Sequence, residues 1–141
     1  MIYFNCDYAE GCHPDILKRL TETNMEQTIG YGMDEHCRHA ADLIKKACDA
    51  PDADVHFLVG GTQTNATVID AALKPYQGIL CAETGHINVH ETGALEACGH
   101  KCITFPTGDG KIEAAQIHDY AQEHFRNGGN EHMAQPKMVY I

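Results

Sequence analysis

Residues 55–65 read VHFLVGGTQTN, and this stretch decides which fold the sequence predicts. The short apolar run at 55–59 is rich in β-formers and predicts a buried central strand. The glycine pair at 60–61 predicts a tight turn where the backbone can lie close to a ligand. Thr62 then opens a helix, whose first N–H groups lack partners and attract an anion such as phosphate. These residues alone equally allow an ordinary turn between strand and helix, and they match neither standard glycine-rich nucleotide motif.

On both sides of this stretch, helical patterns alternate with short apolar runs. The apolar spacing predicts helices over residues 13–23, 34–50, 92–97 and 112–125, and a further one from Gly61 to the residue before Pro75. The apolar runs predict strands over residues 78–83, 101–105 and 138–141. Such alternation is typical of the α/β class, with a mainly parallel sheet flanked by helices.

The domain organisation predicted from this pattern is a single incomplete domain over residues 1–141. Residues 1–33 form its N-terminal arm, first helix and loop. The sequence stops at Ile141 within an apolar run that resembles a strand. We therefore expect the chain to be the first part of a larger domain.

The charge balance excludes several classes of partner. The 141 residues include 10 Lys and Arg against 20 Asp and Glu, a net charge of −10. Nucleic-acid surfaces and surfaces that bind anionic membranes both need clustered positive charge, so neither partner is expected. Since no apolar run is long enough to span a bilayer and no signal-peptide pattern opens the chain, we expect a cytoplasmic protein.

The cysteine and histidine patterns do not indicate a disulfide framework or a metal centre. The 7 cysteines are odd in number and form no C-x-x-C motif, which favours free thiols in a reducing compartment. Among 10 histidines, the best local ligand set pairs His86 with His90, which lie one helical turn apart if that segment is helical, and adds Glu91 next to the second histidine. It is not an H-E-x-x-H motif and no further ligand stands at a recognised spacing, so no metal is predicted.

Several stretches together resemble one enzyme family. They are FNCDYAEGCHPDIL (4–17), GYGMDE (30–35), FLVGGTQTN (57–65), ILCAETGHINVHETGALE (79–96), GHKCITFPTGDGKI (99–112) and QPKMVYI (135–141). In their order and spacing they look like the threonine aldolase or β-eliminating lyase family, whose members use pyridoxal 5′-phosphate and have the aspartate-aminotransferase-like fold. The resemblance implies that the chain is the N-terminal part of the large cofactor-binding domain.

The resemblance also implies roles for individual residues. Gly60, Gly61 and Thr62 fall where the family binds the cofactor phosphate. His86 falls where a family histidine stacks on the pyridine ring, and an imidazole there can also transfer protons. Glu91 matches a family glutamate near the same ring.

Three further residues match positions that contact the substrate. Tyr31 matches a tyrosine that reaches the site of a neighbouring subunit, which implies a homodimer or homotetramer. Cys6 stands where the family usually has a serine that helps to hold the substrate carboxylate, although a thiol is a poorer donor. His132 falls where a second catalytic histidine contacts the substrate hydroxyl. On its own, it reads equally well as a histidine in a solvated loop.

By this resemblance the protein is a lyase that cleaves β-hydroxy-α-amino acids, such as threonine into glycine and acetaldehyde, by retro-aldol cleavage of the Cα–Cβ bond. Two alternatives stay open: β-elimination from another amino acid, and a non-catalytic α/β module that binds a phosphate ligand. The lysine that binds the cofactor covalently and the aspartate that pairs with its pyridine nitrogen fall beyond Ile141. We therefore expect residues 1–141 alone to be inactive.

Overall fold

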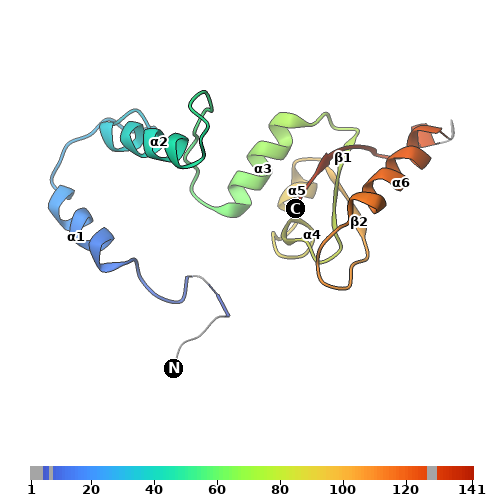
Figure 1. Cartoon of the computed structure of the whole chain (residues 1–141), viewed down its shortest axis with the longest axis horizontal. Coiled ribbons are helices and arrows are strands. Elements are labelled where there is room, and N and C mark those ends of the chain that lie inside the picture. Colours follow the sequence, from blue (N-terminus) through green and yellow to red (C-terminus); the bar gives the residue numbers. More distant parts are fainter. Residues whose placement is uncertain (1–4, 7, 127–129) are drawn as a thin grey trace. The chain divides into compact units, whose positions relative to one another are not determined.

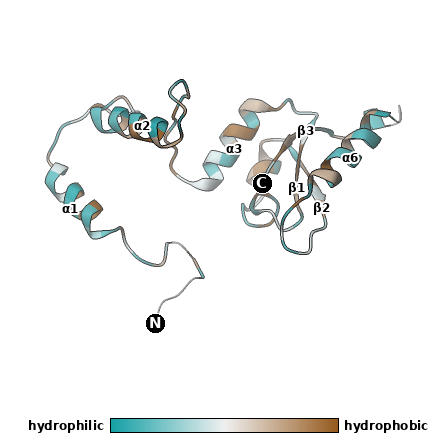
Figure 2. Cartoon of the chain, in the orientation of Figure 1, coloured by the Kyte–Doolittle hydropathy of each residue, from teal (hydrophilic) through white to brown (hydrophobic). Residues whose placement is uncertain are grey.

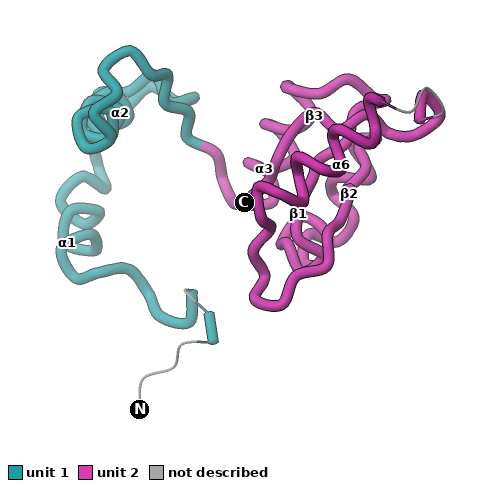
Figure 3. The backbone as a smooth tube through the Cα atoms, turned by 45° about the vertical axis from the view of Figure 1, so that its right-hand side comes forward, with its two compact units in different colours: residues 1–57 teal, residues 58–141 magenta. Residues whose placement is uncertain are grey.

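The computed structural model describes residues 5–6, 8–126 and 130–141. The chain divides into two compact units, residues 1–57 and residues 58–141, which we call the N-terminal and C-terminal units (Figure 1; Figure 3). None of the helices in these described ranges is long and apolar enough to cross a membrane.

The N-terminal unit contains two helices, α1 (Pro14–Thr23) and α2 (Glu35–Ala47). Pro14 suits the first turn of α1, because the N–H that proline lacks would have no intrahelical partner there. Asp34 caps α2 by accepting a hydrogen bond from the backbone N–H of Cys37 at 2.9 Å. Both helices confirm the helical patterns seen in the sequence.

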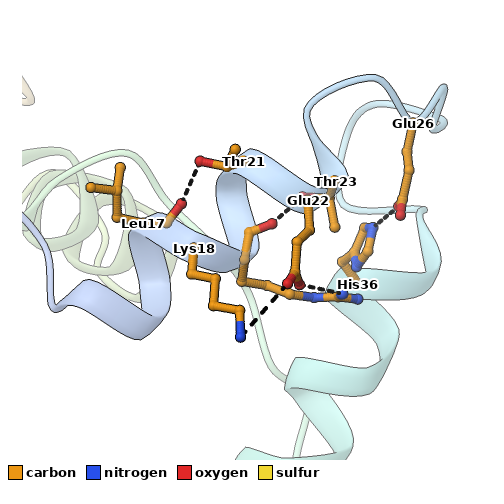
Figure 4. Close-up of polar contacts among 8 residues, drawn as sticks. Leu17, Lys18, Thr21, Glu22, Thr23, Glu26 and His36 are labelled. Carbon is orange, nitrogen blue, oxygen red and sulfur yellow. Dashed lines mark hydrogen bonds and ion pairs between the residues drawn. The ribbon is translucent and has the colours of Figure 1, made fainter.

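Figure 4 shows two ion pairs of the N-terminal unit whose side chains are exposed. His36 Nε2 lies 2.9 Å from Glu26 Oε2, and Lys18 Nζ lies 4.0 Å from Glu22 Oε1. Such exposed pairs contribute little stability, because water screens them. None of the described residues of this unit is buried, and the hydropathy colouring in Figure 2 shows polar surface along much of both helices.

The C-terminal unit is built on a three-stranded parallel sheet with the order β2-β1-β3. Its strands are β1 (Gln77–Ala82), β2 (Lys101–Phe105) and β3 (Gln135–Val139). All six residues of the central strand β1 are buried. β3 is an edge strand and can therefore include Pro136, which has no N–H to donate to a ladder. The three strands confirm the expected parallel sheet, and β3 begins earlier than the apolar pattern alone suggests.

Helices cover both faces of this sheet: α3 (Gly61–Ala72), α4 (His86–Val89), α5 (Ala94–Ala97) and α6 (Ala114–Arg126). On one face, α3, α4 and α5 supply the apolar side chains that pack with strand β1; the buried cluster comprises Ile69, Leu73, Ile79, Cys81, Ile87 and Leu95. On the other face, the ring of Phe105 on β2 meets the ring of Tyr120 on α6 edge to face, with centroids 5.6 Å apart. The α/β class with a helix-flanked parallel sheet is thus confirmed.

The predicted central strand at residues 55–59 is wrong. These residues have no strand conformation, and Val59 is 95% exposed. A strand needs a hydrogen-bonded neighbour, and no described segment pairs with this one. The N–H of Val59 instead donates to Gln63 Oε1 at 2.9 Å, which joins this segment to the start of α3. The buried central strand of the described sheet is β1.

All seven cysteines are free thiols, as the sequence predicts. Cys81 and Cys102 lie on neighbouring strands within the apolar core. The hydrogen bond that the Cys102 thiol donates to Cys81, together with burial, holds the pKa of Cys102 far above its ordinary value. Cys102 is therefore an uncharged packing residue of the sheet.

Candidate active site

The carboxyl ends of the parallel strands form the candidate site, as expected for an open α/β sheet. Strand β1 ends at Ala82 and leads into His86, while β3 ends at Val139 and leads into Tyr140. The early part of α3 reaches the same edge, because Asn65 Nδ2 lies 3.5 Å from the phenol oxygen of Tyr140. Three segments far apart in the sequence therefore meet there.

A histidine–carboxylate contact is the centre of this site. His86 Nδ1 lies 2.8 Å from Glu91 Oε1. The His86 side chain is 56% exposed, whereas the Glu91 side chain is only 2% exposed. Asn65 Nδ2 donates to the same Glu91 oxygen at 2.6 Å. A buried carboxylate requires hydrogen-bond donors, and these two side chains supply them.

Gly85 fixes where His86 begins helix α4. Its N–H donates to the carbonyl oxygen of Ala82 at 2.8 Å. A Cβ atom at position 85 would lie 2.9 Å from that same oxygen, so only glycine fits this close approach. The tight turn brings the imidazole to the sheet edge immediately after β1.

The start of α3 offers free backbone donors. No described residue accepts a hydrogen bond from the N–H groups of Gly61, Thr62 or Gln63, and Gly60 at the N-cap has no side chain to cap them. A Cβ atom added to Gly60 or Gly61 would meet nothing within 4 Å. Gly60 is extended, with φ −167° and ψ 165°, and Gly61 is helical. Open space, rather than a left-handed backbone, therefore distinguishes this glycine pair.

The structure does not bring His132 to this site. His132 is exposed and ends a short 3₁₀ helix (Asn130–His132) that precedes β3. Because β1 and β3 are parallel, with Gln77 opposite Gln135, His132 lies at the amino-terminal edge of the sheet. The six residues of β1 at about 3.3 Å each separate that edge from His86 by roughly 20 Å. Within one chain the described structure keeps His132 apart from His86, and its role as a second catalytic residue stays a prediction.

Tyr31 and Cys6 belong to the N-terminal unit. Tyr31 has a left-handed backbone, with φ 65°, and its side chain is fully exposed. Cys6 is half-buried. Their roles in substrate binding stay predictions.

Two contacts of the site carry no signal in the sequence. Polar residues are common at helix starts, so Asn65 does not stand out there, and Tyr140 falls in an apolar run typical of a strand. They meet across 75 residues, and Asn65 meets Glu91 across 26. Only the tertiary fold shows that Asn65 belongs with His86 and Glu91.

The histidine pair next to Glu91 does not extend into a metal centre. The rings of His86 and His90 have centroids 5.6 Å apart and are tilted by 52°. Within the described ranges, no group of three or more His, Cys, Asp or Glu side chains is arranged to hold a metal ion.

Comparisons with known proteins agree with this geometry. The model of the beta-eliminating lyase family matches residues 7–141. A low-specificity L-threonine aldolase from Pseudomonas aeruginosa is 30% identical over 120 residues, which are 84% of this chain and 34% of that protein. A protein of the same name from another Pseudomonas strain is 28% identical over 140 residues, or 98% of this chain and 39% of that protein.

A solved structure extends the comparison to three dimensions. A threonine aldolase from Leishmania major superposes with a TM-score of 0.89 at 49% identity, over 96% of this chain and 38% of that one. The chain thus spans between about a third and two fifths of the length of these relatives. The resemblance seen in the sequence is confirmed, and the chain belongs to the beta-eliminating lyase family.

Proposed function

We propose that this chain forms part of a pyridoxal-phosphate-dependent lyase that cleaves threonine and similar β-hydroxy-α-amino acids into glycine and an aldehyde. The observation that carries the proposal is the exposed imidazole of His86, anchored through Nδ1 to the buried Glu91 at 2.8 Å. The names of the similar proteins, all threonine aldolases, support the choice of reaction.

The residues at the sheet edge fit this cofactor. The free N–H groups of the first turn of α3 suit a phosphate, because a helix N-terminus attracts anions. Gly60 and Gly61 leave the space in front of these groups open, and Thr62 adds a hydroxyl. The flat ring of His86 would cover one face of the pyridine. When bound, the cofactor withdraws electrons from the bond that breaks.

His86 can handle a proton at a defined atom. We infer that Nδ1–H donates to the Glu91 carboxylate 2.8 Å away, which leaves the free lone pair on Nε2. We propose that Nε2 accepts the proton of the substrate β-hydroxyl during Cα–Cβ cleavage, and that it returns a proton afterwards. This is general acid–base catalysis by a histidine whose orientation is fixed by a carboxylate.

The proposal also gives roles to Tyr31 and Cys6, which belong to the N-terminal unit. By family resemblance, Tyr31 serves the site of a neighbouring subunit in a homodimer or homotetramer, and Cys6 helps to hold the substrate carboxylate. The full exposure of Tyr31 supports the first role, because an aromatic ring in solvent is available to a partner. We expect the enzyme to work in the cytoplasm.

Product analysis tests the proposal. The longest natural chain that contains these residues is incubated with threonine and pyridoxal phosphate, and we expect equal amounts of glycine and acetaldehyde. Ammonia and a 2-oxo acid would indicate β-elimination instead. Cofactor binding without either set of products would indicate the non-catalytic phosphate-binding module. Residues 1–141 alone serve as the comparison, and we expect them to be inactive, because by the family resemblance none of their lysines takes the place of the lysine that binds the cofactor.

A further inference from the structure

We propose that Asn65 is a positioning residue that fixes the tautomer of His86 by holding the Glu91 carboxylate in place. The inference deepens the proposed function and depends on it for its catalytic meaning. The tautomer itself can be measured without cofactor or substrate.

The contacts converge on one atom. Asn65 Nδ2 at 2.6 Å and His86 Nδ1 at 2.8 Å both approach Glu91 Oε1. An ionised carboxylate only accepts hydrogen bonds, so both neighbours must present N–H groups to it. The 2.6 Å donation from Asn65 gives this oxygen a second donor beside His86 and so helps to fix the direction in which the carboxylate faces.

Asn65 has a second polar neighbour. Its Nδ2 also lies 3.5 Å from the phenol oxygen of Tyr140, just after β3. The N–H of Tyr140 donates to the carbonyl oxygen of Leu80 at 2.9 Å, which ties this residue to the central strand. Asn65 therefore connects α3 and the sheet to the loop that carries Glu91.

Neutral His86 carries its proton on one of its two ring nitrogens, and the other nitrogen is the basic atom. A histidine in water favours the Nε2–H tautomer, in which Nε2 has no lone pair for a substrate proton. With Glu91 fixed as an acceptor, the Nδ1–H tautomer is favoured and Nε2 becomes the basic atom. Without Asn65, the carboxylate loses one of its two donors and part of its fixed position, and the tautomer preference should weaken.

The experiment is ¹⁵N NMR of the imidazole nitrogens in cofactor-free protein at about pH 8, above the ordinary histidine range. His86→Phe identifies the His86 signals by their loss. We expect Nδ1–H to be the major form in the unmodified chain. In Asn65→Leu and Asn65→Asp, the Nδ1–H fraction should fall below half. Asn65→Asp keeps the side-chain shape and so covers the case in which the leucine variant does not fold.

Asn88→Leu is the matched control. Asn88 lies on α4 beside His86, but its amide donates to the carbonyl oxygen of Glu83 at 2.7 Å and not to Glu91. It should leave the tautomer ratio unchanged. A major Nε2–H form in the unmodified chain, an unchanged ratio in both Asn65 variants, or an equal effect of Asn88→Leu would overturn the proposal.

Kinetics of the cofactor-loaded enzyme give a second readout. Asn65→Leu should lower kcat by roughly ten- to hundredfold, the range seen for groups that orient metal-bound histidines, with a smaller change in KM. If the unmodified enzyme does not cleave threonine, the proposed function fails while the NMR result still decides the role of Asn65. An unchanged kcat alongside a shifted tautomer would remove Asn65 from the mechanism.

Discussion

Glu91 precedes two consecutive residues with left-handed backbone, Thr92 with φ 55° and Gly93 with φ 74°. Glycine adopts this conformation freely, but a β-branched threonine does so at a cost of about 1 to 3 kcal/mol. Ile87 and Leu95, which come before and after this turn in the sequence, are both buried. The turn directly follows Glu91, whose carboxylate contacts His86.

Substitutions at His86 should separate its two roles. His86→Ala removes both the flat ring and the proton-carrying Nε2, so both cofactor affinity and kcat should fall. His86→Phe keeps a flat face but cannot carry a proton. We therefore expect His86→Phe to restore cofactor affinity while kcat stays at least about a hundredfold below the unmodified value. Cofactor titration and steady-state kinetics of threonine cleavage measure the two effects.

Near-normal kcat in both variants would show that His86 is only a surface residue. His90→Phe is the control, because His90 lies one helical turn away and makes no hydrogen bond to Glu91 in the described structure. It should leave both quantities close to those of the unmodified enzyme.

At the scale of elements, the start of α3 should bind the cofactor phosphate. Gly61→Val places a side chain before the free N–H groups, at a position where an added Cβ atom has no neighbour within 4 Å beyond the adjacent residues and the backbone of the same helix. The fold should therefore survive, because the added Cβ has room and the backbone at Gly61 is helical. Pyridoxal phosphate affinity should drop about tenfold or more, consistent with the loss of a charge-assisted hydrogen bond. Fluorescence or absorbance titration measures this change.

Gly11→Val is the matched control for this change. A Cβ atom at Gly11 also meets nothing within 4 Å, but Gly11 lies in the N-terminal unit and outside α3. Equal cofactor affinity for Gly61→Val and the unmodified protein would remove the phosphate from the start of α3.

The cap of α2 should make this helix sensitive to acid. The backbone N–H of Cys37 donates to the Asp34 carboxylate, which lowers the pKa of Asp34 below its ordinary value. A carboxyl with a lowered folded-state pKa stabilises the folded state fully above its unfolded-state pKa. That stabilisation is lost as the pH falls through the folded-state value. Asp34→Asn still accepts the hydrogen bond but does not titrate, so its α2 helicity should fall less steeply below about pH 4.

Circular dichroism across an acid pH series measures this difference. Asp52→Asn is the control, since it removes the same charge from an exposed position just beyond α2. An acid profile of Asp34→Asn that overlays the unmodified profile would show that the cap does not titrate with the helix.

Local patterns predicted most helices and strands, because periodic apolar residues and caps act over a few neighbours. The patterns behind α2 and β2 are of this kind, and the structure confirms them. Residues 55–59 fail for a physical reason: their β-forming composition is satisfied only by a paired strand, which the described chain does not supply. The short helix α4 was missed within a polar segment, because four residues are too few to show a period.

For the same reason, some residues of the candidate site could be predicted from the sequence and others could not. His86 and Glu91 are close in sequence, and family resemblance pointed to both. Asn65 could not be predicted, because its contact with Glu91 exists only once α3 has packed beside the sheet edge. The role of His132 stays a prediction, because one sequence position does not show at which edge of a parallel sheet a residue lies.

At the scale of the whole molecule, the two units differ in how much they bury. In the C-terminal unit, all six residues of β1 are buried and helices cover both faces of the sheet. In the N-terminal unit, no described residue is buried, and Ile16, Leu17 and Leu20 on α1 are 54–59% exposed. Since helices obtain most of their stability from packing an apolar face, α1 and α2 have little to hold them within their own unit.

The rates of amide hydrogen exchange in residues 1–141 should therefore differ strongly between the two units. The amides of β1 should exchange only through global unfolding of the C-terminal unit, because they are buried and paired on both sides. The amides of α1 and α2 should exchange at least about a hundredfold faster, through local opening that costs little free energy. Mass spectrometry of peptic fragments or NMR measures both sets in one sample. Equal protection of α1 and β1 would contradict the prediction, and would mean that the apolar stripe of α1 is covered in solution. A dilution series distinguishes the source of such cover, because protection from a second copy of the chain would fall with concentration while intramolecular protection would not.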